Sequence, residues 1–91
     1  MHYKGIVLSD YISWQNLDDI FLIVDERKNQ KYILEGTSQE IMLMIVAKKS
    51  VNYIVNALVS KYCVTKEIIK KDVYAFLKEL IDIEVIKVEK E

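Results

Sequence analysis

The residues that could perform acid–base or nucleophilic chemistry are few in this chain. Its only histidine is His2 and its only cysteine is Cys63, so the thiol has no further histidine to activate it. Neither a Cys-x-x-Cys pair nor a His-Glu-x-x-His run is present, which removes the common metal-ligand patterns. The carboxylate pairs at 18–19 and 25–26 lie in predicted turns. The sequence therefore predicts a non-enzymatic protein without metal or cofactor, in which Cys63 is a small buried apolar residue.

Composition limits the partners. The 91 residues are 52% hydrophobic, which predicts a single domain over 1–91 with one core. The net charge of −1 gives no electrostatic indication of nucleic acid or membrane binding. The longest fully apolar run, Ile41 to Ala47, is far below the roughly 20 residues of a membrane span. Asp10 and Trp14 stand where a signal peptide would be apolar, so we expect a cytoplasmic protein.

The first part of the chain is predicted to form strands. Residues 1–5 are expected to lack regular structure, and a first strand is placed in either 6–8 or 11–17. Ile20 to Val24 and Lys31 to Leu34 are short runs rich in β-formers, separated by a charged loop, and are expected to pair as a hairpin. The chain has no proline and two glycines, so composition marks no linker between domains.

Three helical segments are predicted between Leu34 and Ile86. A Thr37-x-x-Glu40 capping box is expected to open the first, Ser50 the second and Thr65 the third. Val85 to Val88 is expected to be a last strand. The predicted fold is α+β and winged helix-turn-helix-like: an N-terminal three-stranded antiparallel sheet, then three helices and a short C-terminal strand.

The faces of the first and third helices indicate what each contacts. The first is apolar nearly all round and is expected to be central, unless Met42 or Met44 meets a partner protein. In the third, steps of about 100° per residue place an apolar arc toward the core. That arc comprises Ile69, Val73, Phe76 and Leu80. Beside it lies a mixed flank of Lys66, Lys70, Tyr74, Leu77 and Ile81, which is either the edge of the core stripe or the wall of a peptide groove.

The stretch from Leu34 to Ile86 resembles the pyrroloquinoline quinone biosynthesis protein D family. The matching residues are Leu34, Thr37, Ile41, Ser50-Val51, Ile54, Leu58, Tyr62, Asp72-Val73, Phe76-Leu77 and Leu80. Glu35, Met42 and Glu84 depart from the usual Asn, Trp and Gly of the family. The hairpin sequence DERKNQKYIL is more similar to the stand-alone members of lasso-peptide pathways.

This resemblance implies a recognition element that holds the leader of a ribosomally made precursor peptide and presents it to a maturation enzyme, such as a leader peptidase, cyclase or radical enzyme. The leader would add a strand in a groove between the third strand and the third helix. An edge strand suits this mode because it offers unpaired N–H and C=O groups. The implied strand wall is Lys31, Tyr32, Ile33, Leu34 and Glu35, and the implied helix wall is Lys66, Lys70, Tyr74 and Leu77.

The alternative is a winged helix-turn-helix transcriptional regulator that binds DNA. Base edges are read chiefly by Arg, Asn and Gln, and none of these occurs in the third helix. The lysines of that helix are offset by neighbouring acids, whereas a DNA-binding domain usually has a basic face. The sequence therefore favours the peptide-binding adaptor.

Overall fold

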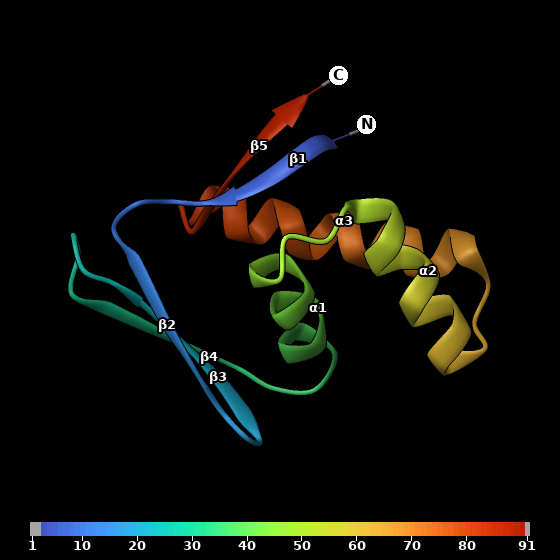
Figure 1. The fold of residues 1–91 in the computed structure, drawn as a ribbon, viewed down its shortest axis with the longest axis horizontal. Helices are drawn as coiled ribbons and strands as arrows, with labels where there is room; N and C mark the ends of the chain where they lie inside the picture. The colour runs from blue at the N-terminus through green and yellow to red at the C-terminus, as the bar shows by residue number, and fades with distance from the viewer. Residues whose placement is uncertain (1–2, 91) are drawn as a thin grey trace.

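The computed structural model describes residues 3–90, which form two small antiparallel sheets and three helices (Figure 1). The elements in order are β1 (Tyr3–Leu8), β2 (Ile12–Leu17), β3 (Ile20–Asp25), β4 (Gln30–Leu34), α1 (Thr37–Val46), α2 (Val51–Tyr62), α3 (Lys66–Asp82) and β5 (Ile86–Lys90). One sheet has the order β2-β3-β4 and the other pairs β1 with β5. The predicted α+β class with a three-stranded sheet before three helices is confirmed.

The three-stranded sheet is built around β3. Alternate residues of β3 are buried, namely Phe21, Ile23 and Asp25, because successive side chains of a strand point to opposite faces. Contacts between α1 and β3 place the first helix against this face. The predicted hairpin is present, with Phe21 paired to Leu34 at one end of the ladder.

The second sheet shows that the strand count was one too low. Both candidate positions for the first strand are strands, and Tyr3 to Gly5, expected to be irregular, belong to β1. These residues form a strand because β5 pairs with them, for example Gly5 with Glu89. The last strand also begins one residue later than predicted, since Val85 is buried and donates its N–H back to Leu80 at 2.9 Å.

The three helix starts differ in their capping. The Ser50 hydroxyl accepts a hydrogen bond from the backbone N–H of Tyr53, as predicted. Thr65 is the residue before α3, but its side chain makes no capping hydrogen bond. The Thr37 capping box is wrong, because Gly36 precedes α1 with φ 60°, a conformation that favours glycine, and Thr37 is already helical. Glu40 instead accepts from Lys61 and Tyr62 and joins α1 to α2.

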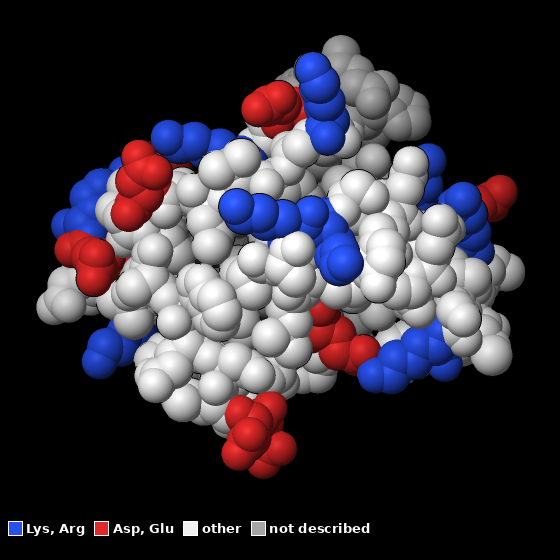
Figure 2. All heavy atoms as spheres, in the orientation of Figure 1, with Lys and Arg blue, Asp and Glu red and all other residues white. Residues whose placement is uncertain are grey.

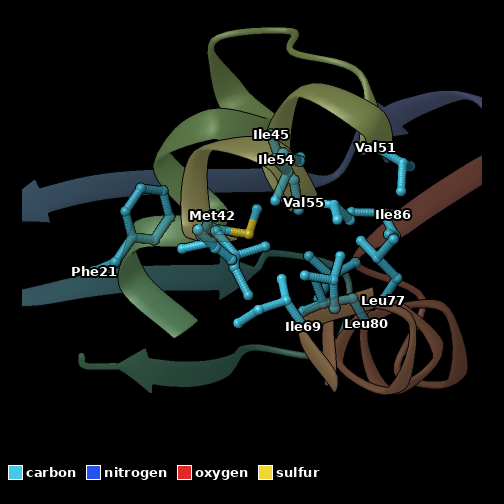
Figure 3. Packing of buried hydrophobic residues seen from close by; sticks show 14 of the residues in the cluster. Phe21, Met42, Ile45, Val51, Ile54, Val55, Ile69, Leu77, Leu80 and Ile86 are labelled. Atoms are coloured by element: carbon cyan, nitrogen blue, oxygen red, sulfur yellow. The ribbon is translucent and has the colours of Figure 1, made fainter. Parts of the chain in front are cut away.

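The core lies between the helices and the two sheets (Figure 3). Ile41, Met42 and Ile45 are buried in it, which confirms that the first helix is central and removes Met42 as a partner contact. The expectation that Cys63 is buried is wrong: it is exposed at the C-terminal end of α2, where its φ is 53°. Within residues 3–90, no helix has both the length and the apolar character needed to cross a membrane.

Candidate functional site

The site predicted from the sequence has β4 as one wall, and this strand has a free edge. β4 pairs with β3 on one side, and within residues 3–90 no other strand pairs with its second side. Lys31, Tyr32, Ile33 and Leu34 belong to β4, and Glu35 follows it directly. Tyr32 and Leu34 pack against the core, whereas Ile33 is 60% exposed. The edge therefore presents backbone groups that an extended peptide can pair with.

The β3–β4 turn is fastened to the end of α3, which fixes β4 relative to that helix. Arg27 binds the buried carboxylate of Asp25 at 3.2 Å and the carboxylate of Glu84 at 3.4 Å. Its guanidinium also lies 4.0 Å above the centre of the Tyr11 ring. Burial acts to raise the pKa of Asp25, but hydrogen bonds from Arg27 and Lys28 outweigh it and hold that pKa below its ordinary value.

Glu84 follows the end of α3, at a position where the family was expected to have glycine. Its φ is 64°, and the N–H groups of Glu84 and Val85 bond back to Ile81 and Leu80, which is the hydrogen-bond pattern of a Schellman motif. A left-handed conformation costs a residue other than glycine about 1–2 kcal/mol. The Glu84 carboxylate pairs with Arg27, and that hydrogen bond, together with the charge of Arg27, holds the pKa of Glu84 below its ordinary value.

The Asp25 anchor makes stability depend on pH. A carboxylate whose pKa is lowered by folding stabilises the protein above its unfolded pKa, and this stabilisation is lost as the pH falls through the folded pKa. Asp25→Asn should therefore lower the melting temperature at pH 7, and the difference from the wild type should shrink below about pH 4. Melting curves of both proteins from pH 7 to pH 3 measure this, and a constant difference across the range would contradict it.

The second predicted wall is α3, and the residues that this helix buries differ from the prediction. Ile69, Val73, Leu77 and Leu80 are the buried residues of this helix. Leu77 was assigned to the groove wall but is 0% exposed and belongs to the core. Phe76 was assigned to the core arc but is half-buried. The stripe is rotated because the β1–β5 sheet, whose first strand was not foreseen, contacts α3 and covers a flank expected to be open.

Lys70 and Tyr74 also belong to the predicted helix wall, and both lie next to β1. The Tyr74 ring lies 5.2 Å from the ring of Tyr3, centre to centre. Both residues line a hollow of about 400 Å³ together with Tyr3, Lys71, Ala75 and Lys78. Lys66 is exposed in the first turn of α3. The structure thus groups Lys70 and Tyr74 with β1 on one flank of α3, opposite the flank that Ile68 and Phe76 occupy.

That opposite flank carries Ile68, Asp72 and Phe76, which succeed one another at four-residue steps and so form a line along the helix. Ile68 is 53% exposed, Asp72 is exposed and Phe76 is half-buried. The tie between Arg27 and Glu84 holds the β3–β4 turn at the end of α3. In Figure 3, β4 and α3 lie on the same side of the core, with Ile69 between them. Sequence reasoning missed this flank because Phe76 was counted with the core arc of the helical wheel.

The fold and the site define an α+β domain with a free strand edge, in which the turn before that strand is tied to the end of the last long helix. Residues 21–86 match the family model described as coenzyme PQQ synthesis protein D (PqqD), and the chain belongs to this family. No curated protein matches the sequence.

Two solved structures share the fold. One is described as TbiB1 in complex with the TbiA(beta) leader peptide; it is 20% identical, with a TM-score of 0.86 over 92% of this chain and 98% of that chain. The other is described as lasso peptide synthetase B1 complexed with the leader peptide; it is 20% identical, with a TM-score of 0.84 over 91% of this chain and 98% of that one.

Proposed function

We propose that this protein is a non-catalytic adaptor that binds the leader of a ribosomally synthesised precursor peptide and presents it to a maturation enzyme. The observation that carries the proposal is the free edge of β4, whose turn from β3 is tied by Arg27 to Glu84 at the end of α3. Membership of the PqqD family and the likeness to two proteins solved with leader peptides support it. Those two proteins, together with the hairpin sequence, favour a pathway of lasso-peptide type.

In this proposal the leader pairs with β4 as an added strand. Each main-chain hydrogen bond contributes about 0.5–1.5 kcal/mol net, so several pairings supply affinity without regard to sequence. In this proposal, selection comes from Ile68, Asp72 and Phe76, on the flank of α3 that is turned away from the Tyr3–Tyr74 contact. Ile68 and Phe76 are apolar and the Asp72 carboxylate lies between them. This arrangement favours a leader that has apolar anchors and a cation or N–H donor near Asp72. Because ribosomes make the precursor, the adaptor would act in the cytoplasm.

The DNA-binding alternative has weaker support. Phosphate contacts require Lys and Arg in excess on one face. The chain has 13 Lys and Arg against 14 Asp and Glu, and Figure 2 shows both signs interspersed on the face in view. α3 also lacks the Arg, Asn and Gln side chains that read base edges.

The direct test is titration of isotope-labelled protein with the leader of the precursor encoded beside its gene. Amide resonances of Lys31 to Glu35 and of Ile68, Asp72 and Phe76 should shift, and those at the Tyr3–Tyr74 contact should shift less. Duplex DNA at physiological salt should cause no saturable change, because the chain lacks a basic face. Sequence-selective binding of DNA without a response to the leader would contradict the proposal.

A further inference from the structure

The free edge of β4 has a counterpart across the same sheet. In the order β2-β3-β4, β2 pairs with β3 alone, and within residues 3–90 no other strand pairs with its second side. Every residue of β2 after Ile12 is exposed. Proteins usually protect such an edge with a charged residue, a proline, a bulge or a covering segment. β2 pairs with β3 in continuous register, without a bulge, and contains neither a charged residue nor a proline.

This lack of charge sets β2 apart from the other strands that the structure describes. Each of those contains at least one charged residue, namely Lys4 in β1, Asp25 in β3, Lys31 in β4 and Lys87 in β5. An exposed, regular and uncharged edge is suited to accept a further strand, because nothing along it opposes main-chain pairing.

The hydrogen bonds of the hairpin show which backbone groups of β2 point to the open side. The Glu26 N–H donates to the Tyr11 carbonyl at 3.0 Å, so these two residues form a hydrogen-bonded pair. Bonded and non-bonded pairs alternate along an antiparallel ladder. Counting along β2 from that pair, the N–H and C=O groups of Trp14 and Asn16 point away from β3.

The Trp14 side chain offers contact area beside this edge. Its ring is stacked on Phe21 at 5.2 Å between centres, and the residue is still 45% exposed. A strand added to β2 would place one of its side chains directly beside the indole. Aromatic residues paired across strands with β-branched ones stabilise a sheet, which favours valine, isoleucine or threonine at that position.

Acidic residues at both ends of β2 indicate the charge of such a strand. Asp10 precedes β2 and Asp18 follows it, and both are exposed. A second copy of the chain, paired antiparallel about Trp14, would bring Asp10 of each copy next to Asp18 of the other, and like charges opposed across strands are destabilising. A strand with Lys or Arg at both ends would instead be attracted. Because Asp10 and Asp18 are eight positions apart, the two basic residues should be eight positions apart as well.

We propose that the open edge of β2 is a second strand-addition site, which takes an extended segment of a partner protein with Lys or Arg at both ends and uncharged β-forming residues between them. This site is separate from the proposed leader site, since the two edges lie on opposite sides of β3. The inference does not depend on the proposed function, and a partner on β2 leaves the edge of β4 open to the leader.

The probe is a synthetic peptide with blocked termini, Lys-Thr-Ile-Thr-Val-Thr-Val-Thr-Lys, whose central valine would lie opposite Trp14. This residue is the only tryptophan of the chain, so its fluorescence reports binding directly. The emission should shift saturably to shorter wavelength as the strand covers the indole, and the amide resonances of Trp14 and Asn16 should move. The same peptide with Glu in place of both Lys should bind about threefold or more weakly, and the difference should shrink at high salt.

N-methylation of the peptide separates strand addition from contact by side chains alone. In the paired strand, the N–H of the central valine faces β2 and that of the threonine before it faces away. Methylating the valine nitrogen should therefore weaken binding by about fivefold or more, whereas methylating the threonine nitrogen should leave affinity within about twofold.

The charge preference is tested on the protein with Asp10→Asn/Asp18→Asn, because asparagine tolerates the φ of 58° at position 18. This variant should bind the Lys-ended and Glu-ended peptides with affinities within about twofold of each other. The matched control is Glu67→Gln/Glu79→Gln, which removes the same charge from exposed positions of α3 and should keep the wild-type preference.

Other outcomes would overturn the site. Equal losses from the two N-methylations, or peptide binding that leaves Trp14 and Asn16 unchanged, would show that no strand is added to β2. A wild-type dimer in sedimentation that Trp14→Lys dissociates would assign the edge to a second copy of the chain. A full-length precursor peptide that shifts the amides of Trp14 as well as those of β4 would assign it to the precursor.

Discussion

Leu77→Ala should lower the free energy of unfolding by about 2–5 kcal/mol, because removing a buried leucine side chain loses its transfer free energy and leaves a cavity. Leu77 is fully buried in the stripe that α3 turns toward the core. Small domains are stabilised by only about 5–15 kcal/mol, so this single change removes a large fraction of the total. Chemical denaturation monitored by circular dichroism measures the loss directly.

The control for this experiment is the next residue, Lys78. Its ammonium is exposed and pairs with Asp82 at 3.6 Å, and such surface pairs contribute about 0–1 kcal/mol. Lys78→Ala should therefore remain within about 0.5 kcal/mol of the wild type. If Leu77→Ala were as stable as Lys78→Ala and instead lost leader binding, Leu77 would belong to the groove wall that the helical wheel assigned to it.

Local signals predicted much of the fold. Ile20 to Val24 and Lys31 to Leu34 are compact β-rich runs, and Ser50 accepts the capping hydrogen bond that its position indicated. The β1–β5 pairing was not predictable in the same way, because Tyr3 and Lys90 are paired across nearly the whole chain. Residues 3–8 do not alternate clearly, and the alternation of residues 86–89 predicts a strand but not its partner. Because the β1–β5 sheet was not predicted, the buried stripe of α3 was assigned to the wrong rotation of the helix. Sequence periodicity cannot distinguish a helix flank that a sheet covers from one that is uncovered.

The candidate site was predicted better on its strand than on its helix. The edge position of β4 follows from chain order, and the structure has that edge free within residues 3–90. The helix wall depended on which face of α3 is turned toward the core. The helical wheel predicts that orientation only to within about one residue, or about 100°. Tyr74 and Phe76 are both half-buried aromatic residues of this helix, and the Tyr3 ring shows which of them faces β1.

Phe76→Ala should weaken leader binding by about thirtyfold or more, whereas Tyr74→Ala should leave affinity within about threefold. An aromatic anchor in an interface is worth about 2 kcal/mol or more, and each 1.4 kcal/mol is about tenfold. The pair is a matched control because both variants remove a half-buried ring from α3 and should destabilise the fold to a similar extent. Titration of each variant with labelled leader, at a temperature where circular dichroism shows both folded, separates binding from stability.

Ile68→Ala supports the same assignment without touching the core. Ile68 is 53% exposed and precedes Phe76 by eight positions on the same line of α3, so its truncation should leave the melting temperature nearly unchanged. If this line of α3 is the groove wall, the loss of apolar contact should weaken leader binding by about fivefold, or roughly 1 kcal/mol. A thirtyfold loss in Tyr74→Ala with normal binding in Ile68→Ala and Phe76→Ala would move the groove to the flank of α3 that contacts Tyr3.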